Sequence, residues 1–165
     1  MKNYQTSEIK NVVLLGAPGS GKTTFAEAMA FEGKVIDRRG SIENENTLSD
    51  NTDLEHSNRR SIYSTILYTE FMNHKLNIID APGSDDFSGG LFAAFKVADV
   101  GLMLFNAQNG FEVGSEIQSR YAKTYNVPLV GVINQLDSEK ANWEGTLESI
   151  ASFSKVKPIV VQYPV

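Results

Sequence analysis

A glycine-rich run near the beginning of the chain constrains the fold more than any other feature. It occupies residues 16–23 and fits the pattern G-x-x-x-x-G-K-[ST]. An apolar run at 12–15 precedes it, and a helical pattern begins at Thr24. Glycines let the backbone curl until several N–H groups face one anion. A strand, this loop and a helix in that order therefore predict a phosphate-binding loop, and they count against a chance match in an ordinary turn.

The loop also predicts which groups contact a nucleotide. The start of a helix supplies N–H groups without intrahelical partners and the positive end of its dipole, and both attract phosphate. Lys22 should reach the β- and γ-phosphates and stabilise charge there during catalysis, and the Thr23 hydroxyl should hold Mg²⁺. We expect the phosphate contacts to come from Ala17, Pro18, Gly19, Ser20, Gly21, Lys22, Thr23 and Thr24.

The composition indicates a single folded domain spanning residues 1–165. With 41% hydrophobic and 21% charged residues, the chain resembles soluble globular proteins rather than disordered ones. The lack of cysteine excludes disulfides, thiolate metal sites and a cysteine nucleophile, and it fits a reducing compartment. A net charge of -5 argues against general nucleic-acid binding, and no run is long and apolar enough to cross a bilayer. We therefore expect a cytoplasmic protein with no membrane partner and no direct nucleic-acid contact.

Apolar runs that alternate with helical patterns predict an α/β fold. We expect helices from the loop to about residue 31 and at 91–98, 116–125 and 143–153. We expect strands at 12–15, 62–71, 76–79, 100–106, 129–133 and 159–161, with 100–106 and 129–133 buried. Residues 37–60 should form a long polar loop, and the short link after 62–71 implies a hairpin. The predicted architecture is a P-loop NTPase three-layer fold, a mostly parallel sheet with one antiparallel hairpin strand.

A second motif, Asp-x-x-Gly, follows the strand at 76–79. Its carboxylate, Asp80, can hold Mg²⁺ directly or through water, and the Gly83 N–H can bond a γ-phosphate. A plain Asp-x-Pro-Gly turn is the alternative, and that turn is common in loops. The phosphate-binding loop earlier in the chain favours the functional interpretation.

A third motif, Asn-x-x-Asp, follows the strand at 129–133. Guanine carries two neighbouring N–H donors that one carboxylate, Asp137, can accept together, and adenine lacks that arrangement. Asn134 could bond guanine or brace the phosphate loop. An ordinary turn at the end of a strand is the alternative. The order and the spacing of the three motifs, rather than any one of them, predict a guanine nucleotide.

The polar stretch before residue 62 is a candidate switch. A hydroxyl there, Ser61 above all, could complete the Mg²⁺ shell when a γ-phosphate is present. A simple solvated loop is an equally good interpretation of this stretch.

Taken in order, these motifs resemble those of translational GTPases, and most closely elongation factor G. The resemblance covers nearly the whole chain. It is carried by 11–16, the loop through Thr24, 76–83, Asp86-Phe87, 110–116 and 134–137. It implies GTP or GDP with Mg²⁺ as ligands, GTP hydrolysis, and the ribosome as a partner, as in a factor that moves tRNA and mRNA.

The chain departs from this family at several positions. Ser84 stands where the family has the histidine that positions the attacking water, so we expect slow hydrolysis. Gln135 replaces the lysine whose stem covers the guanine base, and it can still cover it. Ser61 stands at the position of the switch threonine. The family's last guanine-contacting segment would come after Val165, so we expect a C-terminally truncated GTP-binding domain with weakened nucleotide affinity.

Three functions remain open at this point. The main hypothesis is a GTPase in which Thr23, Asp80 and Ser61 hold Mg²⁺ and Asn134, Gln135 and Asp137 contact guanine. A nucleotide-dependent switch with little hydrolysis is the second, because Ser84 replaces the histidine. An ATP-using phosphate-loop enzyme, such as a small kinase, is the third, and the Asn-x-x-Asp motif argues against it.

Overall fold

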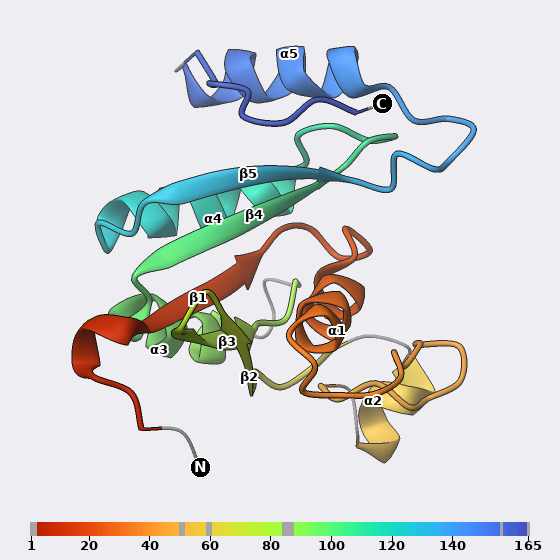
Figure 1. Cartoon of the computed structure of the whole chain (residues 1–165). Helices are drawn as coiled ribbons and strands as arrows, with labels where there is room; N and C mark the ends of the chain where they lie inside the picture. The colour runs from red at the N-terminus through yellow and green to blue at the C-terminus, as the bar shows by residue number, and fades with distance from the viewer. Residues whose placement is uncertain (1–2, 50–51, 59–60, 84–87, 156, 165) are drawn as a thin grey trace.

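The fold is built on one mixed β-sheet, seen in a computed structural model that describes residues 3–49, 52–58, 61–83, 88–155 and 157–164 (Figure 1). The sheet has five strands in the order β2-β3-β1-β4-β5. The strands are β1 (Ile9–Leu15), β2 (Thr65–Phe71), β3 (His74–Asp80), β4 (Val100–Asn106) and β5 (Leu129–Asn134). The helices are α1 (Lys22–Glu32), α2 (Asp53–Asn58), α3 (Ser88–Val97), α4 (Val113–Thr124) and α5 (Trp143–Ser154), and a short 3-10 turn η1 (Thr6–Glu8) precedes β1.

Strand pairing confirms the predicted topology. β1 lies between β3 and β4 and is parallel to both, and β5 is parallel to β4. β2 alone runs antiparallel, paired with β3 across a tight turn in which Met72 and Asn73 both have positive φ. That conformation is typical of the two-residue hairpin turns whose twist matches the strands. The sheet is thus mostly parallel with one antiparallel hairpin strand, as the sequence predicts.

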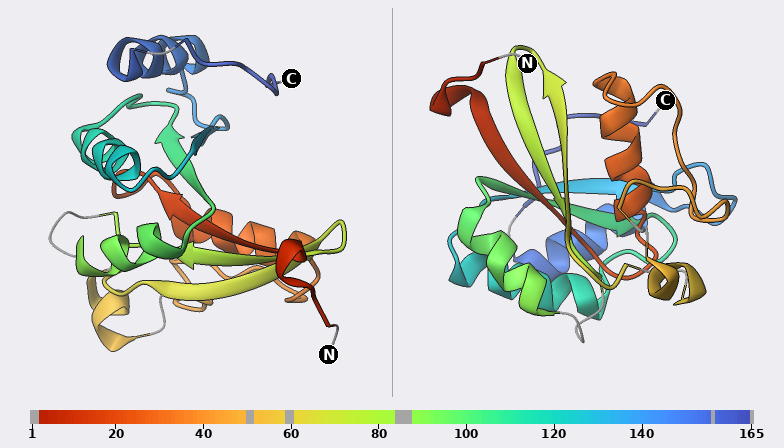
Figure 2. Two further views of the ribbon diagram at one scale, coloured as in Figure 1. Left: turned by 90° about the vertical axis from the view of Figure 1, so that its left-hand side faces the viewer. Right: turned by 90° about the horizontal axis from the view of Figure 1, so that it is seen from below.

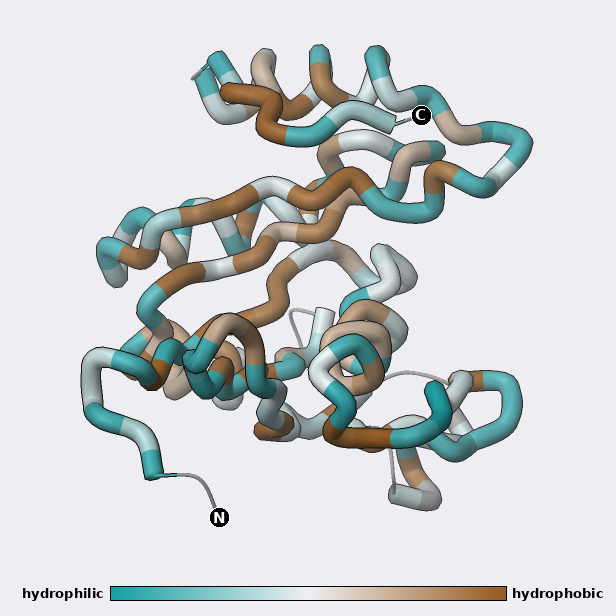
Figure 3. The backbone as a smooth tube through the Cα atoms, viewed as in Figure 1, coloured by the Kyte–Doolittle hydropathy of each residue, from teal (hydrophilic) through white to brown (hydrophobic). Residues whose placement is uncertain are grey.

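Helices cover both faces of the sheet, which gives three layers (Figure 2). Side chains alternate along β1, so that Val13 and Leu15 join one core cluster while Val12 and Leu14 join the other. The first cluster is closed by apolar residues of α3 and α4, and the second by α1, through Ala26. Figure 3 shows the apolar residues concentrated along β1, β4 and β5, in the middle of the molecule. The three-layer prediction is confirmed.

α5 lies beyond the β5 edge of the sheet rather than over its centre (Figure 1). It is attached to the loop after β4, because the Asn142 N–H donates to the Ala107 carbonyl at 2.8 Å. The Phe111 and Phe153 rings also stack, with centroids 4.7 Å apart.

The expectation of an unbroken polar loop over 37–60 is wrong at its end, where α2 forms. The Thr52 hydroxyl accepts from the Glu55 N–H at 3.3 Å, and the Glu55 carboxylate accepts from the Thr52 N–H at 3.3 Å. This reciprocal pair is a capping box, which pairs N–H groups that the first turn of a helix leaves without partners. The Thr-x-x-Glu spacing was therefore a helix signal in the sequence. The strand expected at 62–71 begins later, at Thr65.

Two expectations near the end of the chain are also wrong. The sequence predicts that β5 is buried, but Leu129 is 40% and Val130 is 47% exposed, because within the described residues β5 pairs only with β4. The residues 159–161 form no strand, and Ile159 and Val161 are almost fully exposed. Their segment returns alongside α5, where the Tyr163 ring lies 5.6 Å from that of Trp143. A β-branched run becomes a strand only where a sheet edge pairs with it.

Across the part of the chain that the structure describes, no helix combines the length and the apolar character needed to cross a membrane.

Candidate functional site

The three sequence motifs meet at one edge of the sheet. β1, β3 and β5 are parallel members of the sheet, so their carboxyl ends lie on the same side. Leu14 of β1 is opposite Asp80 of β3, and the loops that follow β1, β3 and β5 begin just beyond these positions. The topology therefore brings together segments that are distant in the sequence.

The phosphate-binding loop curls directly into the first turn of α1. Gly21 precedes the helix with φ 91°, a left-handed conformation that favours glycine. Lys22 is the first residue of the helix and is buried, and its Nζ donates to the carbonyls of Gly16 at 2.9 Å and Ala17 at 3.1 Å. The ammonium group thus folds back against the backbone of the loop that precedes it.

The three expected metal ligands are in hydrogen-bond contact. The Thr23 hydroxyl donates to Asp80 Oδ2 at 3.0 Å, and the hydroxyls of Thr23 and Ser61 are 3.1 Å apart. Asp80 and Thr23 are buried, and Ser61 is partly buried. Hydroxyl and carboxylate oxygens are the ligands that Mg²⁺ prefers in proteins. The donor set therefore fits this ion.

The loop after β3 packs against the phosphate-binding loop. Gly83 is buried, and a Cβ added there would lie 2.5 Å from Lys22 Nζ and 2.9 Å from the Pro18 nitrogen. Only glycine tolerates such an approach without movement of the neighbouring backbone. The structure therefore places Gly83 next to the Lys22 ammonium group, close to any anion that Lys22 would bind.

Two side chains from the end of β5 brace the phosphate-binding loop. Asn134 Nδ2 donates to the Ser20 carbonyl at 2.9 Å, and Gln135 Nε2 donates to the Gly19 carbonyl at 2.8 Å. Of the two roles considered for Asn134, the structure shows the bracing role. Asp137 lies two residues further on, exposed in the turn after β5.

One polar atom inside the loop also fits a phosphate ligand. The Ser20 side chain is buried, and its Oγ has no hydrogen-bond partner among the described residues. Buried hydroxyls are nearly always paired in folded proteins, so a phosphate oxygen bound in this loop would satisfy the Ser20 hydroxyl. Pro18, Gly19 and Thr24 are exposed, so their surfaces are open to a ligand.

Two buried carboxylates hold the long segment between α1 and β2, and the sequence reasoning missed both. Glu27 of α1 accepts from the Gly40 N–H at 3.0 Å and also from the Leu48 N–H. Glu55 accepts from the N–H groups of Ile62 and Tyr63, both at 3.1 Å, on the far side of Ser61 from α2. No sequence pattern distinguishes Glu27 from other helical glutamates, whereas the Thr-x-x-Glu spacing of the capping box singles out Glu55.

The pKa of Glu55 reflects these contacts. Burial by itself raises the pKa of this carboxyl, but hydrogen bonds from Thr52, Ile62 and Tyr63 outweigh burial and lower the pKa below the usual 4.5. Glu55 is therefore held as a carboxylate near neutral pH, bonded to the backbone of the two residues that follow Ser61.

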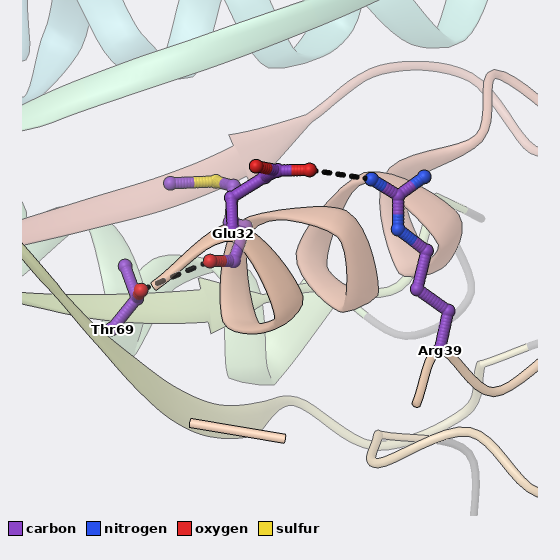
Figure 4. Close-up of polar contacts among 4 residues, drawn as sticks. Glu32, Arg39 and Thr69 are labelled. Atoms are coloured by element: carbon purple, nitrogen blue, oxygen red, sulfur yellow. Dashed lines mark hydrogen bonds and ion pairs between the residues drawn. The ribbon is translucent and has the colours of Figure 1, made fainter. Parts of the chain in front are cut away.

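Two further contacts hold neighbouring segments against α1 (Figure 4). Arg39 pairs with Glu32 at 2.9 Å, and its guanidinium lies 5.0 Å from the centre of the Phe31 ring. The Thr69 hydroxyl of β2 donates to the Met29 carbonyl at 2.9 Å, near the end of the same helix. Exposed pairs such as Arg39–Glu32 contribute little stability. The buried contacts of Glu27 therefore contribute more to holding the following segment against α1.

Some expected site residues lie outside the described residues. They are Ser84, at the position of the family's histidine, and the Asp86-Phe87 pair that contributes to the resemblance.

Comparison with known proteins agrees with this geometry. A family model for the elongation factor Tu GTP-binding domain matches residues 7–161. Elongation factor G of Dehalococcoides mccartyi (strain CBDB1) is 32% identical over 99% of this chain and 24% of its own length. The elongation factor G-like protein of Mycobacterium tuberculosis (strain H37Rv) is 32% identical over 92% of this chain and 21% of its own length. The chain thus spans about a quarter of the length of these relatives.

A solved structure is also similar to this chain in fold and in sequence. The crystal structure of a protein from Thermus thermophilus superposes with a TM-score of 0.84 and 32% sequence identity. The match covers 88% of this chain and 22% of that protein. These findings confirm both the predicted fold and the resemblance to translational GTPases: the chain belongs to the elongation factor Tu GTP-binding domain family.

Proposed function

We propose that this chain binds GTP and GDP with Mg²⁺, hydrolyses GTP, and works in the cytoplasm as part of a factor that acts on the ribosome. The observation that supports this most directly is the contact of the Thr23, Asp80 and Ser61 oxygens beside Lys22. The relatives named elongation factor G support the ribosome as partner. No one of the three motifs supports the proposal as strongly as their meeting at one sheet edge.

Phosphate recognition would come from the loop and the start of α1. In the structure the Lys22 ammonium is held by the carbonyls of Gly16 and Ala17, and it would exchange these for β- and γ-phosphate oxygens. The N–H groups at the start of α1 and the Ser20 hydroxyl would add neutral donors. This arrangement places positive charge where negative charge develops during phosphoryl transfer.

Thr23, Asp80 and Ser61 would hold the metal, and a bound Mg²⁺ would neutralise charge on the β- and γ-phosphates. Gly83 lies against Lys22 and Pro18, so its N–H is close enough to respond to a γ-phosphate. The segment before β2, which contains Ser61, and the loop after β3, which contains Gly83, would then respond to the presence of the γ-phosphate and so distinguish GTP from GDP.

Base selection would depend on Asp137. Its carboxylate can accept both N–H donors of guanine, and its exposure leaves both oxygens available. Asn134 and Gln135 would act on the loop, as the structure shows them doing, and the Gln135 stem would also cover the base.

A second candidate function is a nucleotide-dependent switch that hydrolyses GTP very slowly. The observation in its favour is the serine at position 84, because a serine hydroxyl is a far weaker proton acceptor than a histidine ring. An ATP-using enzyme is a weaker alternative, because the Asp137 carboxylate matches the two neighbouring N–H donors of guanine and adenine lacks that arrangement.

Calorimetric titration with GTP, GDP and ATP, each with and without Mg²⁺, tests the proposal. We expect binding of GTP and GDP, a higher affinity for GTP when Mg²⁺ is present, and no measurable binding of ATP. Equal or tighter ATP binding would favour the third hypothesis and overturn guanine selection. Phosphate release, measured with and without ribosomes, separates the first two functions. Turnover that rises on ribosomes supports the GTPase, and a rate that stays negligible supports the switch.

A further inference from the structure

A buried glutamine in α4 contacts both backbone polar groups of the first loop residue. Gln118 Oε1 accepts from the Gly16 N–H at 2.6 Å, and Gln118 Nε2 lies 3.4 Å from the Gly16 carbonyl oxygen and donates to it. The side chain of Gln118 is only 1% exposed, and 102 residues separate the two positions. None of the three nucleotide motifs includes this residue.

Gly16 needs such a partner because it lies just past the sheet. The register of β1 with β4 ends at Leu15 opposite Met103, so the Gly16 peptide groups are beyond the ladder. Gly16 is buried and has φ 134°, and a Cβ there would overlap the Leu104 carbonyl. Buried backbone groups without a partner are costly. A primary amide is the side-chain group that carries a donor and an acceptor side by side, and it matches a peptide N–H and C=O.

The Gly16 carbonyl has a second donor, and that donor is Lys22. Lys22 Nζ lies 2.9 Å from the same oxygen that accepts from Gln118. A shift of the Lys22 ammonium group toward nucleotide phosphates would weaken its contact with this carbonyl oxygen. The amide of Gln118 then keeps this buried oxygen paired, which lowers the free-energy cost of releasing Lys22.

We propose that Gln118 is a positioning residue of the phosphate-binding loop. It holds the Gly16 peptide in one orientation, and it keeps the Gly16 carbonyl paired while Lys22 moves to the phosphates. The effect on nucleotide affinity rests on the proposed function. The hydrogen bond from the Gly16 N–H does not, so the two can be tested separately.

Gln118→Met tests the proposal, because methionine keeps the length and flexibility of the side chain but removes the amide. Gln108→Met makes the same chemical change at an exposed glutamine in the loop after β4. Ala122→Gly is the control for stability. Ala122 is buried one turn further along α4, and glycine weakens the helix without touching Gly16.

Two measurements are compared across these variants. GDP affinity, measured by calorimetry well below the unfolding temperature, should fall about tenfold in Gln118→Met, as expected for one buried group left without a partner. It should stay near the wild-type value in Gln108→Met and Ala122→Gly. In hydrogen exchange, the wild-type Gly16 amide should be protected like those of β1, and this protection should be lost in Gln118→Met.

The outcomes separate the two proposals. If the wild-type chain binds no GDP, the proposed function fails, and the Gly16 amide still reports on the contact with Gln118. If Gln118→Met binds GDP as tightly as wild type, or if Ala122→Gly weakens binding equally, Gln118 has only a structural role. Rapid exchange of the Gly16 amide in the wild-type protein would overturn the inference without any variant.

Discussion

The Thr23 hydroxyl donates to Asp80 Oδ2 at 3.0 Å and so links the first turn of α1 to the end of β3. In sequence these residues are 57 positions apart. Both are buried, and Ser61 contacts the same hydroxyl from the segment before β2. This link brings the loop, the Asp-x-x-Gly segment and the candidate switch to one point, and it leads directly to a prediction about metal dependence.

Thr23→Ala should remove most of the Mg²⁺-dependent part of GTP affinity. The substitution deletes the hydroxyl that contacts both Asp80 and Ser61, and a lost hydrogen bond to a charged group costs about 1.5–3 kcal/mol, or roughly tenfold or more in affinity. Titration with GTP in the presence and absence of Mg²⁺ measures the effect. Thr124→Ala is the matched control, because Thr124 is exposed near the end of α4. An unchanged Mg²⁺ dependence in Thr23→Ala would remove Thr23 from the metal site.

Asp137→Asn should exchange guanine specificity for xanthine specificity. An asparagine amide presents a donor where the carboxylate presents an acceptor, so guanine donors would be mispaired at a cost of about 1–3 kcal/mol. Xanthine carries a carbonyl in place of the exocyclic amine and should bind the variant more tightly than guanine does. Competition between GDP and xanthosine diphosphate checks this. Glu139→Gln, which removes a nearby exposed charge, should leave the preference for guanine intact. A variant that still prefers GDP would show that Asp137 does not read the base.

Glu27→Ala should destabilise the protein much more than Glu32→Ala, although both residues lie on α1 and both contact the following segment. Glu27 is buried and pairs the N–H groups of Gly40 and Leu48, so its loss should cost about 2 kcal/mol or more of unfolding free energy. Glu32 forms an exposed pair with Arg39, which is worth less than about 1 kcal/mol. Urea unfolding measures the difference. Equal losses in the two variants would contradict the anchoring role of Glu27.

The stabilising effect of Glu55 should depend on pH. Hydrogen bonds from Thr52, Ile62 and Tyr63 hold the pKa of Glu55 below 4.5 in the folded chain, despite the opposing effect of burial. A lowered folded-state pKa stabilises the folded state above the unfolded-state pKa, and this stability is lost as pH falls through the folded-state pKa. The unfolding free energy of the wild type should therefore exceed that of Glu55→Gln at neutral pH, and the difference should shrink below about pH 4.5.

Urea unfolding at several pH values measures this difference. Glu43→Gln is the control, because Glu43 is exposed in the same inter-element segment and should show no comparable pH dependence. A difference between wild type and Glu55→Gln that stays constant with pH would mean that the carboxylate is not what holds Ile62 and Tyr63.

Much of the fold and of the site could be predicted from local patterns. Hydrophobic patterns in the sequence predict the strand at 100–106 with its observed bounds and the helix at 143–153 with its observed start. The hairpin of β2 and β3 followed from a short connection between two runs of β-forming residues. The carboxyl ends of parallel strands lie on one side of a sheet. Because each of the three motifs follows a strand, the sequence predicts that they meet there.

Other features depended on partners that are distant in sequence. Glu27 looks like any helical glutamate until Gly40 and Leu48 are seen to donate to it. Ile159 and Val161 have the side chains of a strand, but they lie beside α5 and are exposed. Local composition does not report whether a sheet edge is available for pairing, and that availability decides whether a β-branched run becomes a strand.

By itself, the sequence determined the chemistry of the loop and the order of the elements, because glycine spacing and hydrophobic periodicity act over a few neighbouring residues. Only the tertiary structure decided which polar groups meet. Gln118 reaches Gly16, and Asn134 reaches Ser20, across 102 and 114 residues. Buried backbone groups must find partners wherever folding brings a donor or an acceptor within reach, and that proximity exists only once the sheet and its helices have packed.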